Sequence, residues 1–255
     1  MKITTILPIS RTTFLERVIK SLENQTYKIK NLIVIFDGED RDYIQVRNRI
    51  VELEFENVLC VPSQHTATAH SIPDRRRHIV NIHNQFKTLI GEADWIFSIE
   101  DDGILPEDAL EKLVIATKDR PDTGMITGVE LGRWGVPYVG AWVVDDIEIT
   151  KSVTSIDNKA GDEVVDKIDA CGLYCALIRA DLYKQHEFFT YNGLGPDVNL
   201  GLFLRQQGLQ NYIHWGVPVT HITIFYGTEK HIPANSNSRV VKLKLLSGNT
   251  WQASH

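Results

Sequence analysis

The stretch WIFSIEDDG, residues 95–103, is an apolar run that ends in three consecutive carboxylates. A short apolar run with aromatic and β-branched residues is typical of a buried strand. Ligands gather at the carboxyl ends of strands in open α/β sheets, so Glu100, Asp101 and Asp102 are expected to face a binding crevice. Three adjacent carboxylates repel one another unless a cation compensates their charge, which predicts a site for Mg²⁺ or Mn²⁺. The alternative is a solvated acidic turn that caps the helix expected after Pro106.

Two further apolar runs, residues 3–9 and 31–36, lie upstream of this stretch, and a helical pattern separates them. We expect Thr12 or Thr13 to cap this helix, with an apolar face made of Leu15, Val18, Ile19 and Leu22. The two runs are continuous rather than alternating, which is typical of parallel strands that are covered on both faces. Strand, helix and strand in this order predict a βαβ unit and therefore an α/β fold.

The remaining patterns extend this architecture without a linker, an internal repeat or a low-complexity block. Helices are expected over residues 41–53, 74–90 and 107–116, and strands over residues 57–61, 125–129, 138–144 and 167–179. We therefore expect a single domain over residues 1–225 and a basic tail over residues 226–255. The tail is expected either to close over the site as a lid or to be a frayed terminus.

The composition is that of a soluble globular protein. Hydrophobic residues make up 43 % and charged residues 24 % of the 255, which excludes a wholly disordered or fibrous chain. The formal net charge of −6 is too small to predict a nucleic-acid or membrane partner from bulk charge. Cys60, Cys171 and Cys175 form an odd set without metal-finger spacing. With no apolar run long enough for a signal peptide or a membrane span, we expect a cytoplasmic location.

Taken together, these segments resemble the GT-A fold glycosyltransferases, especially the family-two group of nucleotide-diphospho-sugar transferases. The resemblance extends over roughly residues 3–225 and follows the family's order, through residues 6–11, 14–17, 22–27, 33–38, 96–106, 171–179 and 195–201. It implies a Rossmann-like α/β fold with a mixed central sheet flanked by helices. Residues 1–105 would then bind the nucleotide sugar and residues 106–225 would face the acceptor.

The resemblance also implies which residues bind the donor. The expected donor-binding residues are Pro8, Ile9, Ser10, Arg11, Asp37, Arg77, Glu100, Asp101 and Lys230. Pro8, Ile9 and Ser10 would line the nucleoside pocket, and Asp37 would bond the base. Glu100 would reach the ribose, although the family usually has Asp at this place.

Two of these donor assignments have plain alternatives. Arg77 stands in a basic run, residues 75–78, whose members cannot all face one pocket, so it is either a donor ligand or surface charge. Lys230 would meet a phosphate only if the tail acts as a lid.

The metal ligands and the catalytic base follow from the same resemblance. Asp102 and His221 would hold Mn²⁺ or Mg²⁺, although a lone histidine is more often structural. Asp197 would act as the general base of an inverting transfer, in a place where the family commonly has Glu-Asp and this chain has Pro196 before it. Asp197 could instead cap the helix that follows it. Retention remains an alternative, because retaining GT-A enzymes share the acidic strand end and the later histidine.

The other aromatic and imidazole side chains are interpreted as structural. Trp134, Trp142 and Trp215 are expected in the core, although such rings can also support a sugar. The remaining histidines considered, which are expected to be structural or on the surface, are His65, His70, His78, His83, His186 and His214.

The function predicted from these observations is a metal-dependent hexosyl- or pentosyltransferase that uses a nucleoside-diphosphate sugar, with UDP favoured. The acceptor hydroxyl could belong to a glycan, a lipid-linked intermediate, a small molecule, a protein, or a hydroxylated base in nucleic acid; residues 75–78 and the basic tail permit the last. One alternative is a sugar-phosphate nucleotidyltransferase, but such enzymes usually carry a glycine-rich basic loop after the first strand, and residues 10–13 contain no glycine. The other is a catalytically silent module that binds a nucleotide sugar or a glycan, which loss of the acidic cluster or of Asp197 would favour; both are present.

Overall fold

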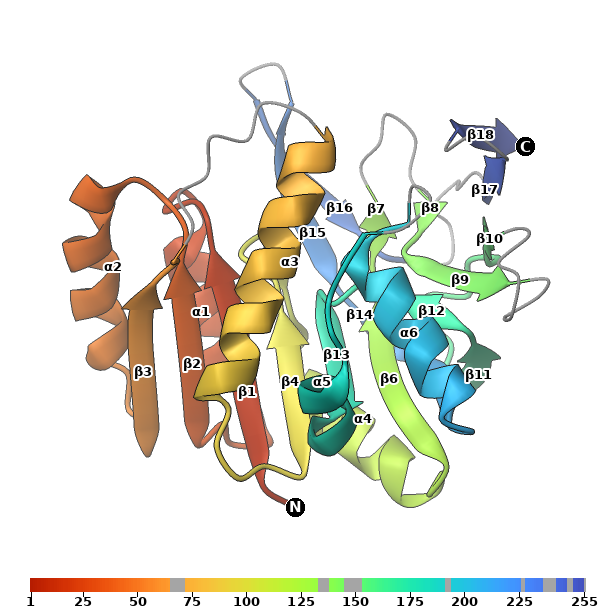
Figure 1. Ribbon diagram of the computed structural model, residues 1–255, viewed down its shortest axis with the longest axis horizontal. Helices are drawn as coiled ribbons and strands as arrows, with labels where there is room; N and C mark the ends of the chain where they lie inside the picture. Colours follow the sequence, from red (N-terminus) through yellow and green to blue (C-terminus); the bar gives the residue numbers. More distant parts are fainter. Residues whose placement is uncertain are drawn as a thin grey trace.

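The computed structural model describes residues 1–64, 72–132, 138–144, 153–190, 194–225, 228–235, 242–246 and 250–254. Its centre is a sheet with helices on both faces (Figure 1). The eight strands of this sheet are β1 (Ile3–Ile9), β2 (Asn31–Phe36), β3 (Asn57–Pro62), β4 (Trp95–Ile99), β6 (Thr123–Val129), β11 (Val165–Ile168), β13 (Cys175–Arg179) and β14 (Gln210–Pro218). Their order across the sheet is β11-β14-β6-β13-β4-β1-β2-β3.

The central sheet is mixed, as the sequence predicted. Strands β4, β1, β2 and β3 are parallel, and β13 runs antiparallel between β4 and β6. Because β13 is antiparallel to both of its neighbours, β4 and β6 point the same way. The carboxyl ends of β1, β2, β4 and β6 therefore meet at one edge of the sheet.

Helices cover both faces of this sheet, which explains why its strands read as continuous apolar runs. The helices α1 (Leu15–Glu23), α2 (Asp40–Val51) and α4 (Ala109–Lys118) pack on one face, and α3 (Ile72–Leu89), α5 (Ala180–Gln185) and α6 (Pro196–Gln206) on the other. On β1, Leu7 joins the first of these two cores and Ile6 joins the second, and both side chains are fully buried. Alternate side chains of one strand thus serve opposite cores.

Three smaller sheets flank the second half of the central sheet. A three-stranded sheet contains β5 (Gly103–Ile104), β15 (Thr220–Phe225) and β16 (Thr228–Pro233), and a pair is formed by β7 (Leu131–Gly132) and β8 (Tyr138–Val139). The third contains β12 (Ala170–Cys171), β9 (Ala141–Val144), β10 (Val153–Ser155), β17 (Lys242–Leu246) and β18 (Thr250–Ser254). In the C-terminal tail, β16 pairs with β15 and β17 pairs with β10, while β18 pairs with β17.

Three local expectations are corrected by the structure. Helix α1 begins at Leu15 after Phe14, whose side chain makes no cap hydrogen bond, and Thr12 uses its carbonyl to accept the Leu15 N–H at 3.1 Å. Neither Thr12 nor Thr13 is the N-cap. The strand expected over residues 167–179 is three strands in two different sheets, and the one expected over residues 138–144 is interrupted at Gly140.

All three cysteines are buried free thiols. Within the described parts of the chain, no helix has the length and apolar character needed to cross a membrane.

Helix α6 lies unusually close to β12. A Cβ atom on Gly201 would stand 2.6 Å from the Cβ and 2.7 Å from the Cα of Ala170, so only glycine allows this approach. The amide of Asn211, which is fully buried, donates to the carbonyl of Gly201 at 2.9 Å and to that of Asp169 at 2.7 Å. These contacts fix α6, and with it the residues of its first turn, against the sheet.

We predict that Gly201→Ala lowers the free energy of unfolding by about 1–3 kcal/mol through overpacking against Ala170, despite the roughly 1 kcal/mol by which alanine favours a helix over glycine. Urea unfolding measures this change. The matched control is Gly91→Ala, because nothing lies within 4 Å of a Cβ at Gly91. Equal stability of the two variants would contradict the close approach.

Candidate functional site

The loops that follow β1, β2 and β4 meet at one edge of the sheet. Ser10 and Arg11 follow β1, Asp37 follows β2, and the acidic residues 100–102 follow β4. The backbone N–H of Asp37 donates to the carbonyl of Ile9 at 2.7 Å, which joins the first two loops. The predicted convergence on one edge is therefore present in the structure.

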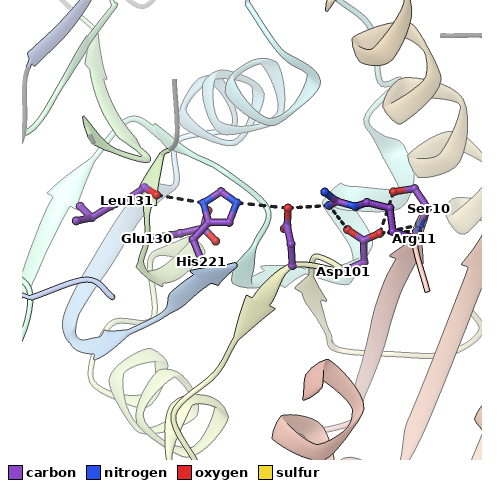
Figure 2. A network of polar contacts seen from close by, with 7 residues as sticks. Ser10, Arg11, Asp101, Glu130, Leu131 and His221 are labelled. Carbon is purple, nitrogen blue, oxygen red and sulfur yellow. Dashed lines mark hydrogen bonds and ion pairs between the residues drawn. The ribbon is translucent and has the colours of Figure 1, made fainter. Parts of the chain in front are cut away.

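The carboxylate of Asp101 holds the loop after β1 in place. Its Oδ2 accepts hydrogen bonds from the backbone N–H of Ser10 at 2.8 Å, the hydroxyl of Ser10 at 2.8 Å and the backbone N–H of Arg11 at 3.1 Å. Its Oδ1 accepts from Nη2 of Arg11 at 2.7 Å (Figure 2). In this arrangement Asp101 positions the loop. Its predicted contact with a donor stays a prediction.

Asp102 and His221 are 119 residues apart in sequence, yet they meet here. Strand β15 pairs with β5 so that His221 lies opposite Gly103, and the N–H of Ile222 donates to the carbonyl of Asp102 at 2.7 Å. The imidazole Nε2 then lies 3.3 Å from Oδ2 of Asp102, and both side chains are buried.

The second ring nitrogen of His221 settles which atom carries the proton. Nδ1 lies 3.1 Å from the carbonyl oxygen of Leu131 (Figure 2). A carbonyl oxygen can only accept, so Nδ1 carries a proton, and in the neutral ring Nε2 then presents a lone pair to Asp102. Two electron-rich atoms at this distance need a proton or a cation between them. A histidine that binds a metal through one ring nitrogen usually donates the N–H of the other to a carbonyl or carboxylate, as Nδ1 does here.

The guanidinium of Arg11 lies between the two aspartates. Nη2 is 2.7 Å from Oδ1 of Asp101 and 2.7 Å from Oδ2 of Asp102, and the group lies over the ring of Phe14. Burial acts to lower the pKa of Arg11, but the charges and hydrogen bonds of the two aspartates outweigh it and hold that pKa above its ordinary value. Arg11 therefore compensates the repulsion between the carboxylates.

Asp37 has a partner that the sequence did not indicate. It is buried, and Nε2 of His78 on α3 contacts its Oδ2. Burial raises the pKa of Asp37 to about 7, the hydrogen bond from Ser63 opposes this rise, and the charge of Asp101 adds to it. His78 was expected to be structural or on the surface, and the structure instead places it against a candidate donor-binding residue.

Asp197 stands in the first turn of α6. The helix begins at Pro196 after Gly195, so Asp197 follows the cap position and is not the N-cap. A Cβ atom on Gly195 would lie 3.3 Å from Cγ of Asp197 and would collide with its Oδ1, which shows how far the carboxylate folds back. Burial raises the pKa of Asp197, while the backbone N–H groups of Val198 and of Asp197 itself, and the charge of Arg76, act to lower it.

Within the basic run at the start of α3, the structure separates the arginines. Arg77 is exposed, whereas Arg76 is half-buried and exerts its charge on Asp197. The predicted donor contact of Arg77 stays a prediction. Arg76 is the member of the run that is linked to a candidate catalytic residue.

A cavity of about 170 Å³ lies beside His221 and Asp197. Its described lining residues are Glu100, Glu130, Gly132, Tyr138, Gly140, Trp142, Gly172, Tyr174, Asp197 and His221. Sequence reasoning missed Glu130, which follows the apolar strand β6 just as Glu100 follows β4, and this shared pattern was the signal that could have found it. Glu130 is buried, and its Oε2 lies 3.8 Å from Nδ1 of His221.

The remaining expected donor-binding residues lie in β1 and on β16. Pro8 and Ile9 lie in β1, and Ile9 is fully buried. Lys230 is exposed on β16, directly across from Thr223 on β15. Cross-strand partners share a face and residues two apart on a strand share it too, so Lys230 lies on the face of the β15–β16 hairpin that carries His221.

Two of the three tryptophans can be placed. Trp215 is fully buried and donates through Nε1 to Asp166 at 2.9 Å, which confirms its predicted place in the core. Trp142 is buried as predicted, and it also lines the cavity. Trp134 lies outside the described residues, as do His65 and His70.

Comparison with known proteins identifies the fold. No protein-family profile and no curated protein sequence matches the chain. Among solved structures, GalNAc-T7 with UDP, GalNAc and Mn²⁺ is 10 % identical, with a TM-score of 0.63, over 89 % of this chain and 45 % of that chain. S. aureus TarS 1–349 is 11 % identical over 84 % of this chain, with TM-scores of 0.55 in its complex with UDP-GlcNAc and 0.53 with UDP.

This chain spans about half the length of the GalNAc-T7 and TarS chains. The likeness covers most of the described domain. The protein has the GT-A fold of the glycosyltransferases, as the sequence predicted.

We predict that Arg11→Ala lowers the free energy of unfolding by about 1–2 kcal/mol. The variant leaves Asp101 and Asp102 uncompensated, and the figure is well below that of a fully buried pair because the Arg11 side chain is 39 % exposed. Urea unfolding at neutral pH measures the loss. The control is Lys30→Ala, which removes an exposed ion pair with Glu56 and should change little. Equal effects of the two substitutions would contradict the compensating role of Arg11.

Proposed function

We propose that the protein is a glycosyltransferase that moves a hexosyl or pentosyl group from a nucleoside-diphosphate sugar, preferably a UDP-sugar, to an acceptor hydroxyl. The observation that carries the proposal is the pairing of Asp102 with His221 at the sheet edge where the donor-binding loops meet, with Asp197 across the adjoining cavity. The GT-A fold supports it, and the solved structures that share this fold include complexes with UDP and UDP-GlcNAc.

The residues at this edge fit a divalent cation. A carboxylate oxygen and an imidazole nitrogen converge at 3.3 Å, and both are donors that Mn²⁺ accepts. Among the described residues, no group of three His, Cys, Asp or Glu side chains is close enough to hold an ion, so Asp102 and His221 would hold it together with donor phosphates. When bound, the ion would neutralise the charge that develops on the departing nucleoside diphosphate.

The other residues at the edge are proposed to bind and orient the donor. Ser10 and Arg11 hold a loop shape fixed by Asp101, and Asp37 lies beside this loop with His78. Lys230 brings a positive charge to the face of the hairpin that carries His221, where it would meet the diphosphate. Each of these groups would hold the donor by its position and charge.

Asp197 is proposed to take the proton of the acceptor hydroxyl at a carboxylate oxygen as that hydroxyl attacks, which corresponds to inversion. Its raised pKa makes it a stronger base than an ordinary aspartate, and the charge of Arg76 limits that rise. Gly195 leaves room for the carboxylate to fold back toward the helix terminus.

We predict different losses on substituting the two aspartates. Asp102→Ala should weaken Mn²⁺-dependent binding of UDP by at least tenfold, because it removes one of two protein ligands of the ion. Asp197→Asn should leave UDP binding unchanged and lower the transfer rate at least a hundredfold, within the range typical of a lost general base. Isothermal titration calorimetry with UDP and Mn²⁺, together with single-turnover rates, separates these effects. Equal loss of UDP affinity in both variants would refute the assignment.

The acid limb of the pH–rate profile tests the electrostatics of Asp197. The base must be ionised to accept a proton, so activity falls as the pH drops through its raised pKa, above the range of an ordinary aspartate. Arg76→Gln removes a charge that lowers this pKa and should move the limb to higher pH. Arg75→Gln, at an exposed neighbouring position, should leave the limb in place. A limb that shifts equally in both variants, or in neither, would contradict the role of Arg76.

A further inference from the structure

We propose that the cavity beside His221 binds one uncharged pyranose ring, laid against the aromatic pair Tyr138 and Trp142, and rejects sugars that carry a carboxylate. This inference rests on the proposed function and names the class of sugar that the site accepts. The features that carry it are the aromatic wall, the glycine floor and the charge of the lining.

The aromatic wall is formed by strands β8 and β9. The rings of Tyr138 and Trp142 lie with centroids 5.5 Å apart and planes tilted by 40°. Tyr138 is half-buried, and both residues line the cavity. Trp142 is buried and supports the ring of Tyr138, which is the more exposed of the two and has little rotamer freedom to lose, so its face suits the apolar C–H face of a pyranose.

The floor depends on glycines that allow Tyr174 to lie flat on the backbone. A Cβ atom on Gly172 would stand 2.6 Å from Cδ1 of Tyr174, and one on Gly140 would stand 2.9 Å from its Cε1. The Tyr174 hydroxyl lies 3.3 Å from the carbonyl oxygens of Gly128 and of Gly140 and donates its proton between them. A side chain at either glycine would push this ring into the cavity, so the two glycines keep the space open.

The polar lining is acidic. Glu100, Glu130 and Asp197 contribute carboxylates, and none of the described lining residues is lysine or arginine. Sugar hydroxyls donate strong hydrogen bonds to carboxylates, whereas the carboxylate of an acidic sugar would be repelled by each of these groups that is ionised. The polar groups therefore discriminate by charge and the aromatic wall by shape.

The cavity is small enough to suit a single ring. Its volume of about 170 Å³ is below the roughly 300 Å³ at which pockets for drug-sized ligands begin. The ring can come from two sources, which are the sugar carried by the donor and the terminal sugar of the acceptor. Both sources present the same uncharged ring to the cavity, and the two arms of the experiment distinguish them.

The test measures binding to the full chain by calorimetry with matched neutral and acidic sugars. The donor arm compares UDP-glucose with UDP-glucuronate and UDP-galactose with UDP-galacturonate, with UDP alone as the reference. The acceptor arm compares the methyl glycosides of the same four sugars, with and without UDP. We expect the neutral member of at least one pair to bind at least tenfold more tightly than its acidic partner. A preference in the donor arm identifies the donor sugar as the occupant, and a preference in the acceptor arm identifies the acceptor sugar.

Variants of Tyr138 and Glu130 tie this preference to the cavity. Tyr138→Ala should reduce binding of the neutral sugar at least fivefold and leave UDP binding unchanged, and Tyr138→Phe should restore it because the ring remains. Glu130→Gln should reduce the discrimination against the acidic partner at least threefold. Because Tyr138 lies on a short strand at the rim of the cavity, thermal melting of each variant verifies that it is folded.

The possible outcomes separate this inference from the proposed function. Equal binding of neutral and acidic partners in both arms, or an unchanged preference in Tyr138→Ala and Glu130→Gln, overturns the inference even if UDP binds. A neutral glycoside that binds without any affinity for UDP, ADP, GDP, CDP or dTDP, each tested with Mn²⁺, supports the cavity and overturns the glycosyltransferase. If none of these nucleotides and no glycoside binds, both are overturned.

Discussion

Four hydrogen bonds to the carboxylate of Asp101 determine the shape of the candidate site. They come from Ser10 and Arg11, and they join the end of β1 to the end of β4. The next carboxylate, that of Asp102, accepts from the same guanidinium at 2.7 Å and lies 3.3 Å from Nε2 of His221. One aspartate thus fixes the loop, and its neighbour links that loop to the strand that carries His221. A parallel pair of strands is required for both, because only then do the two strand ends lie at the same edge.

The site also depends on segments that are distant in sequence. The β15–β16 hairpin brings His221 to the acidic strand end and carries Lys230 on the same face, and α6 brings Asp197 to the lining of the cavity. The hairpin is held by the N–H of Ile222, which donates to the carbonyl of Asp102. Helix α6 is held by its close packing on Ala170, which Gly201 allows. The groups proposed for metal binding and for proton transfer are therefore set by two independent packing contacts, so each can be disturbed without the other.

Basic side chains from different elements lie beside the carboxylates of the site or act on them. Arg11 compensates Asp101 and Asp102, Arg76 acts on Asp197, and His78 contacts Asp37. The cavity itself, as far as its described lining extends, keeps its carboxylates without a basic side chain among them. The donor edge therefore sets the positive charge of Arg11 among its aspartates, whereas the described lining of the cavity contributes carboxylates and no basic side chain.

The sequence by itself determined the βαβ opening, the mixed α/β sheet and the acidic strand end, because continuous apolar runs and a carboxylate cluster are local patterns. Only the tertiary structure decided that Asp101 supports the loop while Asp102 lies beside His221, that the charge of Arg76 acts on Asp197, and that Glu130, Tyr138 and Tyr174 line the cavity. The direction in which a side chain points on a helix or beyond a strand end depends on the elements packed against it. The breaks in the strands expected over residues 138–144 and 167–179 escaped the sequence for the same reason, since Gly140 and Gly172 are needed there by Tyr174, a contact made only after folding.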